Sequence, residues 1–129
     1  MKMRFMLLLV VIFSILFSTE NKTLFDSINS YLKRYRHSIE EKDFNIKNGV
    51  IILELYGRRT NQKSLFLLGF YSIGRQLRKI SFNFREVQII IHYEMKNTQQ
   101  MTAKASIESV LALSQGRISQ EKFFNEIKY

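Results

Sequence analysis

The side chains of this chain that could do acid–base chemistry are few, and they fall in two predicted strands. His92 and Glu94 stand two positions apart in an alternating segment, so both would lie on one face of a strand. With Glu54 on a neighbouring strand and arginines nearby, such a pair could act as general acid and base on a phosphate ester. The same pattern is typical of polar residues on the solvated face of a sheet, and the sequence favours that interpretation.

Metal and cofactor sites are not indicated. The two histidines, His37 and His92, do not form a His-x-His or His-x-x-x-His motif, and the chain has no cysteine to supply thiolate ligands or disulfides. It also lacks the P-loop, the Rossmann glycine pattern and the Gly-x-Ser-x-Gly motif. We therefore expect no metal, no cofactor and no enzymatic activity. A small metal-independent hydrolase that uses His92 with Glu94 is the alternative.

Positive charge is the stronger signal. The formal net charge is +9, and the stretch between Glu54 and Glu86 contains cations but no carboxylate. A group of charges of one sign attracts anions and steers acidic partners, although basic residues can also simply solvate a surface. The candidate anion contacts are Arg58, Arg59, Arg75, Arg78, Lys79 and Arg85.

Tyrosines interleave with these arginines and with those of the first predicted helix, for example Tyr31 and Tyr35 around Arg34. Stacking rings between cations also occur on nucleic-acid surfaces. A tyrosine that buries its ring and leaves its hydroxyl in water is equally common at the edge of a core. We expect a protein partner or an anionic envelope component, lipid head groups or a polymer, in preference to nucleic acid.

The N-terminal segment indicates export. Lys2 and Arg4 precede an apolar run over 5–17 that only Ser14 interrupts. A basic start, a short apolar run and a small residue behind it are typical of a secretory signal peptide. The run is shorter than the ~20 residues that a membrane-spanning helix needs.

We therefore expect a signal peptide over 1–18 and one basic α+β domain over 19–129, periplasmic or secreted. Removal of the two N-terminal cations would lower the formal charge from +9 to +7. The alternative keeps 5–17 as an uncleaved anchor, which would make the chain a membrane-tethered subunit of an envelope assembly.

Hydrophobic spacing predicts the secondary structure. Apolar residues at steps of three and four indicate helices, alternation indicates strands, and Asn48-Gly49 between two β-prone runs indicates a hairpin turn. The expected elements are a helix over 22–40, strands over 43–47 and 50–56, a helix over 62–80, a strand over 82–96, a helix over 98–114 and a short helix after Ser119.

This order predicts an α+β, two-layer sandwich in which helices cover mainly one face of a sheet of about three strands, behind the signal peptide. The function expected from charge and export is a non-enzymatic binding or assembly module of the cell envelope or extracellular space. It would contact anionic or acidic partners through its basic surface, and an exposed sheet edge could pair with a partner strand.

Overall fold

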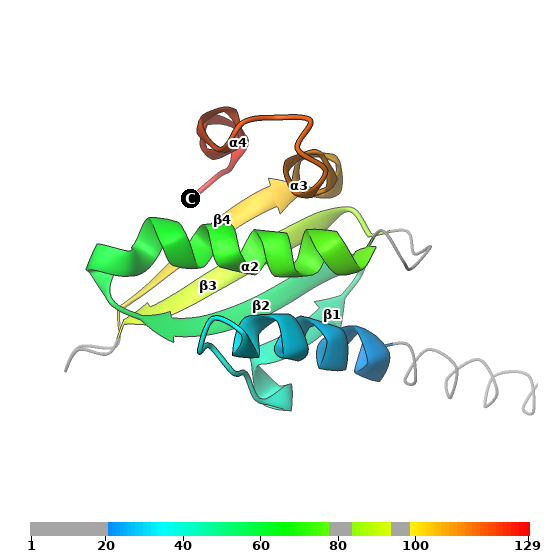
Figure 1. Ribbon diagram of the computed structural model, residues 1–129, viewed down its shortest axis with the longest axis vertical. Helices are drawn as coiled ribbons and strands as arrows, with labels where there is room; N and C mark the ends of the chain where they lie inside the picture. The colour runs from blue at the N-terminus through cyan, green and yellow to red at the C-terminus, as the bar shows by residue number, and fades with distance from the viewer. Residues whose placement is uncertain (1–20, 78–83, 94–98) are drawn as a thin grey trace, which may run out of the picture.

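The computed structural model describes residues 21–77, 84–93 and 99–129, and it has the α+β fold that the sequence predicts (Figure 1). The predicted signal peptide lies outside the described residues. The strands are β1 (Phe44–Lys47), β2 (Val50–Gly57), β3 (Glu86–Tyr93) and β4 (Gln100–Ser106), in that spatial order. The described helices are an N-terminal helix over 21–33, α2 (Gln62–Leu77), α3 (Ile107–Ser114) and α4 (Gln120–Glu126), with 3₁₀ turns at Glu41–Asp43 and Arg59–Asn61.

The sheet consists of two antiparallel pairs joined along a parallel seam. β1 and β2 form the predicted hairpin, in which Asn48 and Gly49 take φ values of 51° and 77°. A type I′ turn requires positive φ at both central residues, which explains the Asn-Gly pair. β2 and β3 are parallel and α2 connects them, whereas β3 and β4 are antiparallel.

The fourth strand corrects the prediction of about three strands and of a helix over 98–114. Residues 100–106 form β4, and the helix begins only at 107, where the Ser106 hydroxyl accepts a hydrogen bond from the Ser109 N–H. Gln, Met, Ala and Lys in this segment favour a helix in isolation. Pairing with β3 and burial of Ala103 and Ala105 under the helices override that propensity.

Two other boundaries also differ from the prediction. The N-terminal helix ends at residue 33 and does not reach 40, because Arg36 takes a left-handed φ of 63° and the His37 N–H bonds to the Leu32 carbonyl. This bond closes the helix end. β3 occupies 86–93 of the predicted 82–96, and parts of the predicted strand lie outside the described residues.

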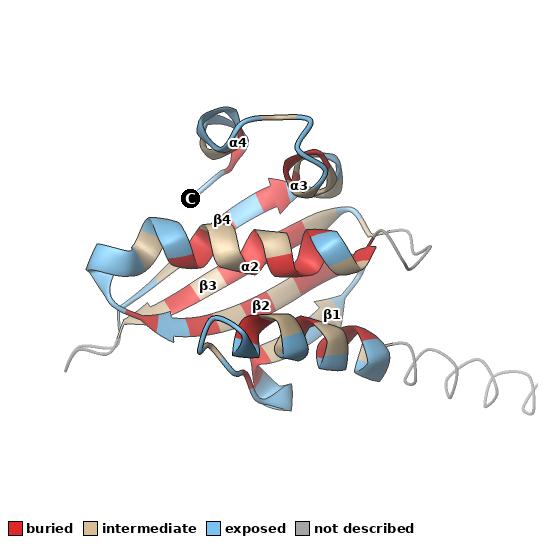
Figure 2. Cartoon of the chain, viewed as in Figure 1, coloured by how far each residue is buried: buried red, intermediate tan, exposed pale blue. Residues whose placement is uncertain are grey.

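One face of the sheet is packed against the helices (Figures 1 and 2). Alternate residues of the central strands, such as Leu53 and Ile89, are fully buried beneath α2, while their chain neighbours are less buried. On the helical side of the sheet, the rings of Phe70 in α2 and Phe123 in α4 pack edge to face, with 5.0 Å between their centres. Gly69 permits the close approach of α2 to the sheet, because a Cβ there would lie 3.0 Å from the Ile89 side chain.

The opposite face of the sheet, called the open face below, is only partly covered by the described residues. Glu54, Gln88, Ile90 and His92 are only partly buried on it, and Tyr56 is 49% exposed. None of the helices in the described ranges is long and apolar enough to cross a membrane.

Candidate functional site

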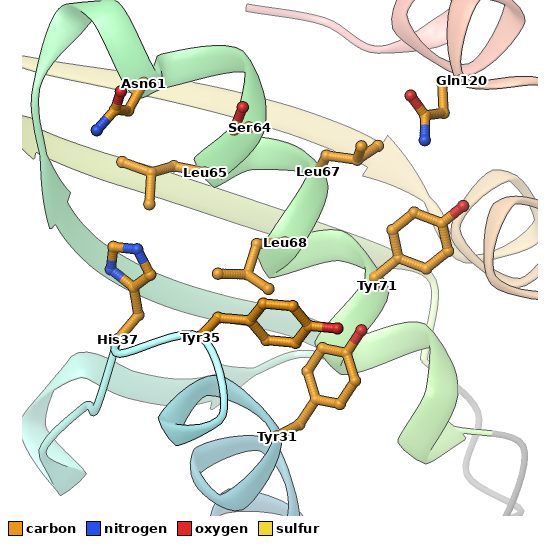
Figure 3. A pocket seen from close by; sticks show the side chains of 10 residues that line it. All are labelled: Tyr31, Tyr35, His37, Asn61, Ser64, Leu65, Leu67, Leu68, Tyr71 and Gln120. Atoms are coloured by element: carbon orange, nitrogen blue, oxygen red, sulfur yellow. The ribbon is translucent and has the colours of Figure 1, made fainter.

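A groove of about 510 Å³ runs along the outer side of α2 (Figure 3). The N-terminal helix contributes Tyr31 and the turn that follows it contributes Tyr35, with 5.3 Å between their ring centres. Leu68 and Tyr71 of α2 line the groove beside them. The lining comprises Tyr31, Tyr35, His37, Asn61, Ser64, Leu65, Leu67, Leu68, Tyr71 and Gln120.

The sequence places apolar residues on both sides of α2, and this produces the groove. The inner side carries the buried residues Phe66 and Phe70, which face the sheet. The outer side carries Leu67, Leu68 and Tyr71, which are partly buried. A helix that is hydrophobic all round is normally enclosed on all sides. In the described part of the chain, α2 keeps its outer side open.

A second cleft, of about 320 Å³, continues the groove toward the C-terminal end of α2. It shares Tyr31 with the groove and adds Arg34 and Arg75. The Arg75 guanidinium lies 5.0 Å from the centre of the Tyr31 ring, a cation–π contact that joins the two clefts. Together they follow α2 from Ser64 to Gln76, which is about 18 Å of helix.

The arginine end of this combined groove favours anions. Among the described residues that line the two clefts, Asp26 is the only carboxylate, against Arg34 and Arg75. Partial burial and the neighbouring Tyr35 raise the pKa of Tyr31, and Arg75 opposes that rise. The Tyr31 phenol therefore stays neutral at physiological pH and offers a ring and a hydroxyl to a ligand.

The predicted anion contacts do not form one patch in the described part of the chain. Arg58 and Arg59 lie where β2 ends and α2 begins, whereas Arg75 lies at the far end of α2 and Arg85 at the start of β3. The 16 residues of α2 separate these ends by about 24 Å. That is roughly three Debye lengths at physiological ionic strength, so the two ends act as separate charged regions. Arg78 and Lys79 lie outside the described residues.

Two of these arginines also have structural contacts. The Arg59 guanidinium lies 5.4 Å from the centre of the Tyr93 ring and donates a hydrogen bond to the Gln99 side chain. Arg85 donates from Nε to the Asn48 carbonyl oxygen at 3.1 Å and so braces the β1–β2 turn. A structural role therefore accounts for part of the basic sequence signal.

The acid–base candidates lie on the open face of the sheet. His92 Nε2 is 2.8 Å from Glu54 Oε1, and the Tyr56 ring stacks on the imidazole at 5.0 Å. The Tyr56 hydroxyl donates to Asp43 at 3.2 Å, and the pKa of Tyr56 is raised by desolvation and then by the Asp43 charge. Glu94, the predicted partner of His92, lies outside the described residues.

This arrangement supplies a histidine–carboxylate pair that lies apart from the groove and from the second cleft. A third cleft, of about 310 Å³, lies near Arg85 and Lys104, and none of the three clefts is lined by His92 or Glu54. Within the described ranges, no three side chains of the metal-binding types stand close enough together to hold a metal ion.

The apolar residues of the groove belong to the helical stripes of the sequence and, taken one by one, give no separate sign of a binding surface. Tyr31, Tyr35, Leu68 and Tyr71 fit the apolar stripes of two predicted helices, yet Tyr35 is 53% exposed and the others are partly buried. The apolar residues on both sides of α2 were the available signal for an outer binding surface.

No family model, no curated protein and no solved structure matches this chain. Assignment of a function therefore depends on the residues of the groove and of the open sheet face.

Proposed function

We propose that the chain is a non-enzymatic binding or assembly module, exported by a signal peptide over 1–18, that holds an acidic protein partner in the groove along α2. The observation that supports this function is the groove itself. Its leucine and tyrosine lining leads directly to Arg34 and Arg75.

The lining favours a protein over a lipid surface. Protein interfaces combine an apolar core with a polar rim, and tyrosine and arginine are enriched among their energetically dominant residues. The groove has this composition, with Leu67 and Leu68 between hydroxyl, amide and guanidinium groups. An anionic membrane would instead favour one broad basic face, whereas Arg58 and Arg59 lie at one end of α2 and Arg75 at the other.

The remaining basic residues would assist the encounter with an acidic partner. Charges outside an interface raise the association rate more than the final affinity. We assign this role to Arg58, Arg59, Arg78, Lys79 and Arg85.

The alternatives have less support. A hydrolase that uses His92 with Glu94 needs an enclosed site, and neither the groove nor the other two clefts adjoin His92. A tethered subunit would depend on 5–17 remaining attached as an anchor, although that apolar run is short.

The binding function can be tested with a fluorescent random copolymer of glutamate and tyrosine and the full-length chain. We expect binding that weakens with salt and falls about tenfold in the Arg34→Glu/Arg75→Glu variant. The charge-matched control replaces two exposed cations outside both clefts, Lys33→Glu/Arg117→Glu, and should bind nearly as well.

Three results would contradict the proposal. An equal loss in the control would mean that net charge alone attracts the copolymer. Equal binding of polyglutamate without tyrosine would mean that the apolar lining contributes nothing. Tighter binding to phosphatidylglycerol vesicles than to the copolymer would point to a lipid partner.

Export has its own test. The full-length protein, expressed in a host with a secretory pathway, should appear outside the cytoplasm with about 18 residues removed. Full-mass protein in the membrane would support the tethered alternative, and full-mass soluble protein in the cytoplasm would contradict export.

A further inference from the structure

The outer side of α2 has the residue spacing of a helix–helix seam. Ser64, Leu68, Tyr71 and Arg75 follow one another at steps of four, three and four, and all four line the combined groove. These steps average about 3.7 residues, close to the 3.6 residues of one helical turn, so the four side chains form one row along α2 of the kind that packs against a second helix. Because the inner side of α2 already packs on the sheet, this second seam is available to a further helix.

The N-terminal helix and the first residue after it form the facing wall with the same spacing. Ser27, Tyr31 and Arg34 are separated by four and three residues and line the arginine end of the groove. Two walls with helical spacing make a trough in which a third helix can pack side chains between both rows. The tyrosines and leucines stand in the middle of the trough, where such a helix would place its apolar residues.

The backbone of the occupant also favours a helix. An extended peptide in an apolar trough would need partners for its N–H and C=O groups. The walls are helices, whose own backbone groups are mostly paired internally, and they offer no strand edge. A helix satisfies its own backbone and needs only side-chain contacts. The trough follows α2 for about 18 Å, which matches about 12 residues of helix.

Charge completes the description of the partner. Arg34 and Arg75 lie at one end of the trough, and Asp26 is the only carboxylate among the described lining residues. We infer that the groove binds an acidic amphipathic α-helix of about three turns, which places its apolar side on Leu67, Leu68 and Tyr71 and a carboxylate near Arg75. This inference rests on the proposed binding function.

The test is selection of peptides of about 16 random residues, displayed on phage, against the full-length chain. Binders to the Arg75→Glu variant are removed in each round. Enriched sequences should be net acidic and should carry apolar residues at i, i+3 or i+4, and i+7. The most enriched sequence is then synthesised together with a variant that has one proline at its centre, which should bind at least about tenfold more weakly.

Two groove variants sharpen the test. Leu68→Glu should weaken binding of the synthetic peptide about tenfold or more, whereas Leu68→Met, which conserves volume, should retain most of it. Circular dichroism of each variant verifies that the fold is intact. Loss of binding in Leu68→Met to the same extent as in Leu68→Glu would contradict a packed leucine contact.

The outcomes separate this inference from the proposed function. Enriched acidic peptides whose binding depends on Arg75 but that lack the helical period would contradict a helical partner and still support an acidic one. Peptides that bind equally well with the central proline would mean the same. If no enriched peptide depends on Arg75 for binding, both the helical partner and the acidic partner are contradicted. Self-association of the chain that Arg75→Glu abolishes would identify a second copy as the occupant and would also overturn the inference.

Discussion

The two faces of the sheet differ in the side chains and in the clefts that they present to a ligand. The open face carries the histidine–carboxylate pair His92 and Glu54, and neither residue lines any of the three clefts described above. The helical side carries the groove, whose lining holds tyrosines and leucines around the single histidine His37. Catalysis needs reactive groups and an enclosed space at the same place. The histidine–carboxylate pair and the groove lie on opposite sides of the sheet, so a ligand bound in the groove would not contact the pair.

The largest expected effect is a difference in the free energy of unfolding between substitutions at two adjacent residues of β3. Ile89 is fully buried on the covered face, whereas Ile90 points to the open face and is partly buried. Ile89→Ala should lower the free energy of unfolding by about 3 kcal/mol, in the range for a buried isoleucine, and Ile90→Ala by about 1 kcal/mol or less. Urea unfolding measures both. Equal losses would mean that the open face is covered by something in solution.

The next effect separates binding from stability on the helical side. Leu67 lines the groove and is partly buried. Leu67→Ser should weaken partner binding about tenfold but change the free energy of unfolding by less than about 1 kcal/mol. Binding assays and urea unfolding on the same variant make the comparison. A larger loss of stability than of affinity would assign Leu67 to the core and remove it from the binding surface.

A smaller effect is expected on the open face. Glu54 and His92 keep 33% and 28% of their side-chain surface in water. Glu54→Gln preserves a hydrogen-bonding group and should change the free energy of unfolding at neutral pH by less than about 1 kcal/mol. A loss of several kcal/mol would show that the pair is shielded from water, and it would revive the case for an enclosed site there.

The smallest effect concerns alkaline pH. The pKa of Tyr56 on the open face and that of Tyr31 in the groove are both raised by desolvation first, and then by Asp43 and Tyr35, respectively. The unfolded chain loses these protons near pH 10 while the folded chain keeps them, so stability falls as the pH rises through the folded-state pKa. Tyr56→Phe and Tyr31→Phe should each flatten this fall in urea unfolding above pH 9. An unchanged slope would contradict the raised values.

Local signals in the sequence predicted local structure well. The Asn48-Gly49 pair identified the β1–β2 hairpin because the turn requires positive φ at two adjacent residues. The α+β class followed from the periods of the apolar residues. β4 was missed, because Ala103 and Ala105 are small residues that suit either a helix or a strand, and only their pairing with β3 decides between the two.

The candidate site could be predicted less well, because it depends on residues that are distant in the chain. Tyr31 and Leu68 meet only when the N-terminal helix lies beside α2. Arg59 and Arg75 are close in sequence, yet they lie at opposite ends of α2. Spacing along the chain indicates which residue types are present but cannot give the distances between residues that are far apart in the fold.

The parallel seam between β2 and β3 also bears on how the chain folds. Each outer hairpin can close by itself within microseconds, because its partners are near neighbours in sequence. Leu53 and Ile89 pair across the seam, and this pairing can form only after the connection through α2 has brought β3 beside β2. We therefore expect formation of the seam to be the rate-limiting step of folding. A φ-value near zero at Leu53 would contradict this, because it would mean that the seam forms after the transition state. Because α2 forms both the crossover and one wall of the groove, the binding surface would be completed in the same slow step that joins the two halves of the sheet.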